Sequence, residues 1–281
     1  MSPRTPDHLD FSEPLTERTP RVVHAAKLHR AAARRKAGVF LAEGENSVEA
    51  AVATAATSTV FVPQAAPSRF GELLSAAVNL GVYLHPVTDR AAESLAETVT
   101  TTGIFAVCRP VTWPLKKALA AGPTLVSVPV ETREPGNAGT LIRVADALGA
   151  DAVVFAGDSV DPQGGKVVRA SAGSLFHVPV ARERDPQSVI DSLRARGLQI
   201  LATAADGEVD LAAPPEPDFF TRPTAWLFGN EAHGLPAELQ QAADHRVAIP
   251  IAGRAESLNL ATAASICLWE SARAQRVHGL D

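Results

Sequence analysis

Two short loops in the second half of the chain carry residue types that could do chemistry. The loop 229–234 places Glu231 between glycines, and the loop 253–259 contains Ser257 and Asn259. Carboxylate, hydroxyl and amide groups placed together in this way orient small polar ligands. A helix that begins after the second loop would add N–H groups with partial positive charge, which suit a carboxylate or a phosphate. The pattern predicts a small-molecule pocket beside an anion site.

Each of these loops follows a short apolar run that must form the element positioning it. The runs 225–228 and 247–251 are continuous rather than alternating, which is typical of buried parallel strands. Ligands of α/β proteins bind where such strands end. Ser257 or Asn259 is suited to cap the alanine-rich helix that follows.

A third candidate is Arg143, which lies in an otherwise apolar predicted helix, 138–148. Asn137 is expected to cap this helix and Gly149 to end it. An arginine in such a helix is costly unless it is paired or faces a ligand. Two interpretations remain open at this point: an Arg143–Asp146 pair at an exposed edge, or a functional guanidinium.

Composition limits the function classes. The chain has 281 residues, 46% hydrophobic and 20% charged, and a net charge of −5, which argues against indiscriminate binding of polyanions. No apolar run is long enough for a transmembrane helix, and the N-terminus does not resemble a secretory signal, so a cytoplasmic location is expected. Cys108 and Cys267 are expected to be reduced core residues, and the eight histidines lack metal-ligand spacing, so no metal site is predicted.

The chain is expected to form two α/β domains. A flexible tail (1–16) precedes a small domain (17–108), a proline-flanked linker (109–123) and a larger domain (124–281). The small domain combines strands at 39–42, 58–62, 82–84 and 104–108 with helices at 46–56 and 68–80. The larger one adds strands at 124–130, 152–156, 178–180 and 199–202 and a helix at 185–196 to the elements above, which predicts a mostly parallel sheet.

The segment 17–36 is strongly basic, with seven cations against one acid. Lys27, Arg30 and Arg34 are spaced three and four apart, so on one helix they would share a face, with Arg35 beside them. This face is either solvated surface or a stripe that binds RNA phosphates without reading sequence.

A second polar segment follows the predicted strand 152–156. Its G-G-K invites a phosphate-loop interpretation, which we reject because the spacing is wrong and Val167 replaces the required Ser or Thr. Lys166, Arg169 and Ser171 are instead candidates for contacts with an RNA backbone.

Three segments of the larger domain resemble the signature motifs of the TrmH (SpoU) branch of the SPOUT methyltransferases. They are E-T-R-E-P-G-N-A-G-T-L-I-R, L-F-G-N-E-A-H-G-L-P and V-A-I-P-I-A-G-R-A-E-S-L-N-L-A-T-A-A-S-I, in the family's order. The N-terminal R-V-V-H-A-A-K-L-H-R and F-L-A-E-G-E-N-S-V-E-A-A resemble the L30e-like substrate-binding domain of members that modify rRNA. One departure is Ala232, where the family usually has glycine; a positive φ there would be strained.

The resemblance implies methylation of a ribose 2′-hydroxyl in RNA, with 23S rRNA as the expected substrate and S-adenosylmethionine (AdoMet) as the methyl donor. It also implies a deep trefoil knot in the C-terminal domain, a homodimer, and no metal. A base-modifying or tRNA-modifying SPOUT enzyme and a non-catalytic rRNA-binding resistance factor remain alternatives. A nicotinamide-dependent dehydrogenase is remote because no strand is followed by GxGxxG.

The resemblance also assigns roles to individual positions. Arg143 would position the hydroxyl or the adjoining phosphate, because arginine is normally fully protonated and a poor general base. The catalytic set comprises Arg143, Asn137, Glu231, Ser257 and Asn259. The AdoMet-binding set comprises Leu227, Phe228, Gly229, Asn230, Ile249, Pro250, Ile251, Ser257 and Leu258. The RNA-binding set comprises Lys27, Arg30, Arg34, Arg35, Lys166, Arg169 and Ser171.

Overall fold

The computed structural model describes residues 12–64, 67–98 and 103–277 and divides the chain into two compact units. Unit 1 takes in the chain up to Val111 together with Gln163–His177, and unit 2 comprises Thr112–Pro162 and the chain from Val178 onward. The predicted tail 1–16 lies mostly outside the described residues. Leu15, near its end, forms a bridge to Val87.

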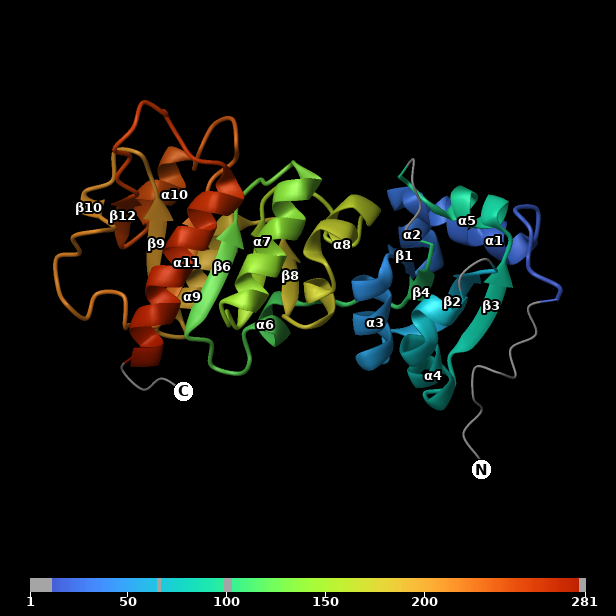
Figure 1. Cartoon of the computed structure of the whole chain (residues 1–281). Helices are drawn as coiled ribbons and strands as arrows, with labels where there is room; N and C mark the ends of the chain where they lie inside the picture. Colours follow the sequence, from blue (N-terminus) through green and yellow to red (C-terminus); the bar gives the residue numbers. More distant parts are fainter. Residues whose placement is uncertain (1–11, 65–66, 99–102, 278–281) are drawn as a thin grey trace. The chain divides into compact units, whose positions relative to one another are not determined.

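Unit 1 is built on a four-stranded mixed sheet (Figure 1). Strand β4 pairs antiparallel with β1 and β2, and β3 pairs parallel with β2 at the edge. The strands in spatial order are β1 (Phe40–Glu43), β4 (Phe105–Cys108), β2 (Thr57–Pro63) and β3 (Tyr83–Val87). All four confirm strands expected from the sequence.

Helices cover both faces of this sheet. The helices are α1 (Pro20–Ala26), η2 (Lys27–His29), α2 (Ala31–Ala37), α3 (Glu45–Ala53), η3 (Pro67–Phe70), α4 (Gly71–Asn79), α5 (Asp89–Leu95), α8 (Gly165–Ser171) and η4 (Ser174–Phe176). Helices α1 and α5 pack Val22, Ala25 and Leu95 against Phe61 and Phe105 of the sheet. This apolar contact forms the core of unit 1 on that face.

The prediction of one basic helix across 27–34 is wrong. Helix α1 ends at Ala26, a 3-10 turn follows, and Arg30 has an extended backbone (φ −87°, ψ 126°) before α2 begins. Lys27, Arg30 and Arg34 therefore do not share one helical face, because spacing of three and four aligns side chains only on an unbroken helix. Helix α5 was not expected from the sequence.

Unit 2 contains an eight-stranded sheet in which all neighbouring strands are parallel, as the apolar runs predicted (Figure 1). The strands in spatial order are β10 (Val209–Asp210), β12 (His245–Ala248), β9 (Gln199–Thr203), β11 (Thr224–Phe228), β6 (Leu125–Pro129), β7 (Ala152–Ala156), β8 (Val180–Glu183) and β5 (Thr112–Trp113). Strand β5 and the short helix α6 (Leu115–Ala118) fall inside the predicted linker 109–123, so that segment is structured.

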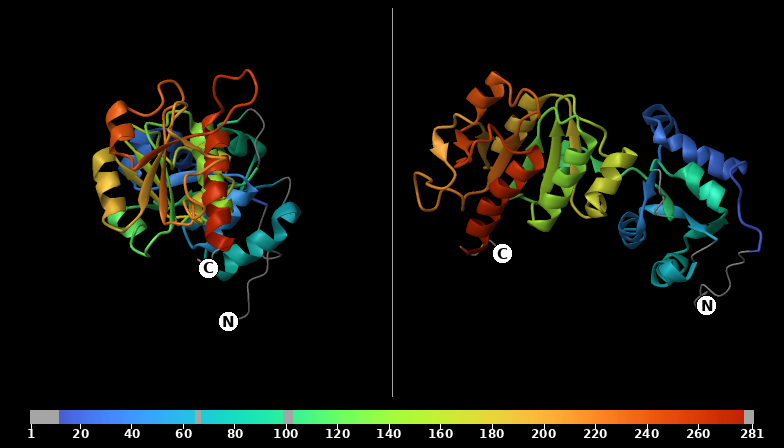
Figure 2. Two further views of the ribbon diagram at one scale, coloured as in Figure 1. Left: turned by 90° about the vertical axis from the view of Figure 1, so that its left-hand side faces the viewer. Right: turned by 45° about the horizontal axis from the view of Figure 1, so that its top comes forward.

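Helices lie on both faces of this sheet, as the end-on view in Figure 2 shows. Helices α7 (Pro135–Ala147) and α11 (Leu260–Val277) pack against each other on one face, while α6, α9 (Pro186–Arg194) and α10 (Ala237–Ala242) share a core with the other face. The buried Trp226 of β11 donates its indole N–H to Ser271 of α11 at 3.0 Å, which fixes that helix on the sheet.

Several local expectations can be checked directly. Gly149 follows α7 with φ +74°, as expected of a helix-ending glycine. Cys108 and Cys267 are free and buried, as predicted, and burial raises the pKa of both thiols. None of the helices in the described ranges is both long and apolar enough to cross a membrane. The knot stays a prediction.

Candidate active site

A pocket of about 590 Å³ opens at the carboxyl ends of β9, β11 and β12, within unit 2. The loops after these strands and the first turns of α7 and α11 supply its walls. Its lining comprises Asn137, Thr203, Ala204, Ala205, Gly229, Asn230, Glu231, Ala232, Gly234, Val247, Ile249, Ile251, Glu256, Ser257, Leu258, Asn259, Leu260 and Ala263. The two loops expected to form a pocket from the sequence therefore do so together.

Three polar side chains from distant parts of the chain form a hydrogen-bonded line at this pocket. Asn137 Nδ2 donates to Glu231 Oε1 at 3.0 Å, and Asn259 Nδ2 donates to Asn137 Oδ1 at 3.0 Å. The carboxylate can only accept, and Asn259 Oδ1 in turn accepts the Ala261 N–H at 2.9 Å. The Glu231 carboxylate at one end and the Ala261 N–H at the other therefore fix the orientation of the Asn137 and Asn259 amides. The two amides thus face the pocket in one arrangement.

Asn137 does not cap α7, contrary to the sequence prediction. The helix starts earlier, at Pro135, and the Glu134 side chain caps it by accepting the Gly136 N–H at 3.1 Å. Proline is well suited to the first helical position because it lacks an N–H that would need a partner. Asn137 therefore lies inside the first turn with its amide free to join the polar line.

Asn259 caps α11, and of the two predicted candidates, Ser257 and Asn259, it is the one whose side chain accepts from the first turn. Its Oδ1 accepts from the N–H groups of Ala261 and Thr262, so these two donors are already occupied. The remaining attraction of this helix start for an anion comes from the partial charge of an 18-residue helix.

Backbone contacts close the loop that follows β11. Asn230 and Gly234 exchange two backbone hydrogen bonds, at 3.0 and 2.9 Å. A Cβ added to Gly229 would lie 2.3 Å from the carbonyl carbon of Gly234, so only glycine fits there. Ala232 is not among the described residues with positive φ, so alanine causes no backbone strain at this position.

Two parts of the site were missed by the sequence analysis. Residues 203–205 line the pocket because β9 lies between β11 and β12 in the sheet. The order of these strands along the sequence does not show that β9 is their neighbour. Glu131 has φ +50°, and its carbonyl accepts a hydrogen bond from Asn230 Nδ2 at 2.7 Å, joining two of the motif loops. No local signal marks a glutamate for a left-handed conformation, which non-glycine residues seldom adopt.

The predicted AdoMet-binding residues divide into two groups. Gly229, Asn230, Ile249, Ile251, Ser257 and Leu258 line the pocket. Leu227, Phe228 and Pro250 are not among its lining residues, and the first two are buried in β11. Ile251 and Leu258 are 39% and 36% exposed, so apolar side chains lie open on the pocket wall.

Arg143 lies on α7 but does not line this pocket. Six residues separate it from Asn137, which rotates it by about 240° around the helix axis. Its side chain is exposed, and no hydrogen bond or ion pair joins that side chain to Asp146 or to another of the described residues.

The predicted RNA-binding residues fall in unit 1 with different surroundings. Lys27, Arg30, Arg35 and Lys166 are exposed. Arg34 donates instead to the carbonyls of Leu28 and His29, at 3.0 and 2.9 Å, and so closes the turn between η2 and α2.

Arg169 of α8 is engaged by two carboxylates. Its Nη1 lies 2.9 Å from Glu43 Oε2 and 3.1 Å from Glu97 Oε2, and the Glu43 side chain is only 3% exposed. Ser171 is fully buried and bonds the Val168 carbonyl at 2.8 Å. The ion pairs of Arg169 hold α8 in unit 1, whereas the Ser171 bond lies within α8. Among residues 12–64, 67–98 and 103–277, no group of His, Cys, Asp and Glu could hold a metal ion.

Comparison with known proteins gives the class first. Residues 124–269 match the SpoU rRNA Methylase family and residues 19–106 match the MRM3-like substrate binding domain. The chain belongs to the SpoU rRNA methylase family.

Individual relatives agree with this assignment. The chain is 34% identical over 250 residues to the 23S rRNA (guanosine(2553)-2′-O)-methyltransferase RlmP of Bacillus subtilis, covering 86% of this chain and 92% of that one. It is 44% identical over 151 residues to a 23S rRNA (uridine(2479)-2′-O)-methyltransferase of Streptomyces viridochromogenes, covering 52% and 50%. Among solved structures, an AdoMet-bound rRNA methyltransferase from Sinorhizobium meliloti superposes with a TM-score of 0.81 at 30% identity, covering 96% of this chain and 99% of that one.

Proposed function

We propose that this chain is a cytoplasmic, homodimeric enzyme that methylates a ribose 2′-hydroxyl of 23S rRNA, with AdoMet as methyl donor. Both near-full-length comparisons support this function, because they are with rRNA methyltransferases. The observation that carries the proposal is the polar line Glu231–Asn137–Asn259, which three sequence-distant motifs form at the rim of one pocket.

The pocket fits AdoMet in size and chemistry. Its volume of about 590 Å³ is in the range of small-molecule sites. Ile249 and Leu258 offer apolar walls, and the carboxylates of Glu231 and Glu256 favour a positively charged ligand. When bound, AdoMet supplies a methyl group that its positive sulfur already activates. The protein has to align the acceptor oxygen with that methyl group and to manage one proton.

We assign the alignment of the acceptor to Arg143. Its guanidinium carries five N–H donors and no acceptor. It can therefore bind the RNA phosphate next to the acceptor ribose and polarise the 2′-oxygen while staying protonated. Asn137, Glu231, Ser257 and Asn259 would fix the shape of the donor pocket, since all four line it.

Arg143 of one chain would act at the pocket of a second copy. The side chain is exposed, lacks a partner among the described residues and does not line its own pocket. Helix α11, beside α7, exposes 49% of Trp269, a large apolar side chain that a second copy would cover. A twofold contact through these helices would complete both sites equally.

Mixed dimers test this assignment. Arg143→Ala should lower methyl transfer by about 100- to 1000-fold, the range for loss of a positioned donor. AdoMet affinity, measured by calorimetry, should stay within about twofold, a change of less than about 1 kcal/mol. The reason is that Arg143 does not line the pocket, so the substitution removes no contact with AdoMet. Mixing Arg143→Ala with Gly229→Ala should restore transfer of tritiated methyl, since one site of each mixed dimer then has an intact pocket and an intact arginine.

The matched control is Arg133→Ala, which removes an exposed arginine that only pairs with Asp158. No restoration in mixed dimers would place Arg143 at its own pocket, and a monomer in sedimentation analysis would remove the dimer altogether. Resistance of the methylated linkage to alkaline hydrolysis distinguishes ribose from base methylation, and absence of AdoMet binding would favour a non-catalytic rRNA-binding factor.

A further inference from the structure

Helices cover one face of the unit 1 sheet incompletely, because Thr59 and Val107 are only partly buried there and Tyr83 is exposed. Helices α1 and α5 cover the end that carries Phe61 and Phe105. At the other end, β2 and β4 align Thr59 with Val107, and β2 and β3 align Thr59 with Tyr83. Paired residues of neighbouring strands point to the same face, so these three side chains lie in one row.

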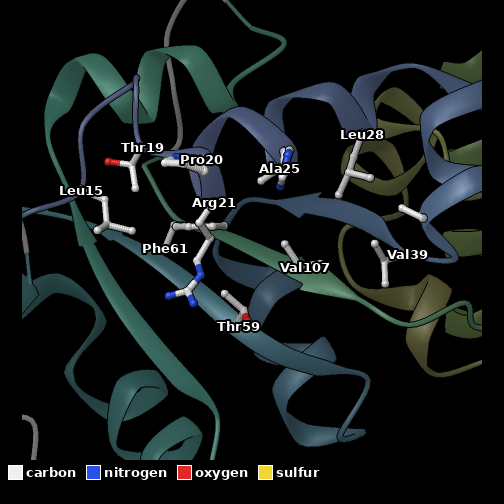
Figure 3. A pocket seen from close by; sticks show the side chains of 12 residues that line it. Leu15, Thr19, Pro20, Arg21, Ala25, Leu28, Val39, Thr59, Phe61 and Val107 are labelled. Carbon is white, nitrogen blue, oxygen red and sulfur yellow. The ribbon is translucent and has the colours of Figure 1, made fainter.

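A hollow of about 560 Å³ lies over Thr59 and Val107 of this row (Figure 3). Thr59, Phe61 and Val107 line it from the sheet, and Arg21 and Leu28 line it from the helical side. Tyr83, at the edge of the row, is the only tyrosine of the chain and is 71% exposed. A flat aromatic ring is thus presented to solvent beside a shallow, largely apolar floor.

A cation is held over the same surface. Arg21 Nη1 donates to His85 Nε2 at 2.8 Å, which requires that nitrogen of His85 to be unprotonated. Burial and the neighbouring Arg21 charge lower the pKa of His85, so the ring stays neutral and keeps accepting. Figure 3 shows the Arg21 side chain crossing the hollow towards Thr59. Its remaining N–H groups can bind an anion.

The surrounding charge indicates the occupant. The exposed cations Arg18, Lys27 and Arg30 belong, with Arg21, to the basic segment 17–36, which contains one acid, Glu17. A positive segment beside an exposed aromatic ring suits single-stranded RNA, in which a base stacks on the ring and the backbone phosphates contact the cations.

We propose that the open sheet face of unit 1, with Tyr83, Thr59, Val107 and Arg21, is a binding site for an unpaired nucleotide of the substrate RNA. This proposal rests on the proposed function. It adds that unit 1 recognises an unpaired base together with the phosphate next to it. Tyr83 stacks on the base, and Arg21, held by His85, contacts the adjoining phosphate.

Binding of unmodified 23S rRNA, transcribed in vitro, to the full chain tests the site. Tyr83→Ala should weaken binding about 10-fold, because stacking of one base contributes about 1–3 kcal/mol. Tyr83→Phe should stay within about twofold because it retains the ring. Leu80→Ala is the matched control, since Leu80 is an exposed apolar residue (56%) that lies before β3. Ultraviolet cross-linking should yield a nucleotide-bearing peptide that contains Tyr83.

Two further readouts separate the possible failures. Arg21→Gln should reduce the slope of log affinity against log salt by about 0.7, the value for one contact with single-stranded RNA. AdoMet affinity should be unchanged in every variant, because that pocket lies in unit 2. Unchanged RNA binding by Tyr83→Ala, or an equal loss by Tyr83→Phe, would overturn the stacking site while leaving the enzyme assignment intact.

A wild-type chain that binds no RNA would overturn the proposed function and this site with it. A change in sedimentation on Tyr83→Ala, without a change in RNA affinity, would instead make this face a contact between two copies of the chain.

Discussion

The two units use their polar residues in opposite ways. In unit 2, Asn137 is hydrogen-bonded to Glu231, 94 positions away, and to Asn259, 122 positions away, and all three lie at one pocket. In unit 1, Arg34 and Arg169 were expected on an RNA-facing surface, yet they bond to carbonyls and carboxylates of the unit itself. The motif residues therefore share one pocket, whereas the spacing of charges along the sequence does not identify which arginines are exposed.

The difference has a physical cause. Short side chains at the ends of parallel strands reach only a few ångströms, so the sheet that brings the loops together also brings these groups together. A long arginine side chain can reach many acceptors, and burial of Glu43 makes a cationic partner energetically necessary. Spacing along the sequence carries no information about such a partner.

The largest effect is expected in unit 1. Arg169→Ala leaves the buried Glu43 carboxylate without its cation, and loss of one partner of a buried pair costs about 3–5 kcal/mol. Backbone amides of β1 should exchange their hydrogens faster and the affinity for RNA should fall, whereas the affinity for AdoMet should not change. Arg69→Ala is the control, because its pair with Glu45 is exposed and contributes less than about 1 kcal/mol. Equal effects of the two variants would refute a structural role for Arg169.

The reverse result is expected for Gly229→Ala in unit 2. The added Cβ would meet the Gly234 carbonyl carbon at 2.3 Å, and overpacking of about 1–3 kcal/mol corresponds to a 5- to 150-fold loss of AdoMet affinity. Calorimetry measures the affinity, and RNA binding should be unaffected. Gly253→Ala is the control, because nothing lies within 4 Å of the added atom. Normal affinity of Gly229→Ala would show that the loop can open at no cost.

The basic segment allows a finer comparison within unit 1. Lys27→Gln with Arg30→Gln should lower the salt slope of RNA binding by about 1.4, the value for two contacts with single-stranded RNA. Arg34→Gln should leave the slope unchanged and lower thermal stability instead, because its guanidinium bonds the Leu28 and His29 carbonyls. A lower salt slope of RNA binding for Arg34→Gln alone would show that Arg34 contacts RNA.

The smallest effect is expected at the cysteines, which occur one in each unit. Burial raises the pKa of Cys108 and Cys267, so less thiolate is present at a given pH than for a free thiol of pKa about 8.5. Iodoacetamide at pH 8 should therefore label neither thiol in the folded protein and both after denaturation, as mass spectrometry can determine. Labelling of one native thiol would identify the unit that opens more readily.

The sequence by itself determined the family, the parallel sheet and the two loops that form the donor pocket. Continuous apolar runs such as 225–228 are typical of buried strands of such a sheet, and their ends carry the polar residues. It also limited the cap of α11 to Ser257 or Asn259, because capping depends on local chain geometry, and the structure selects Asn259.

Tertiary structure alone decided the remaining features. Strand β9 lies between β11 and β12, so residues 203–205 join the pocket, and Pro135 rather than Asn137 opens α7. The segment Gln163–His177 belongs to unit 1, where Arg169 pairs with Glu43, a residue 126 positions away. Strand order and long-range pairing depend on energies summed over the whole fold, which no local pattern contains.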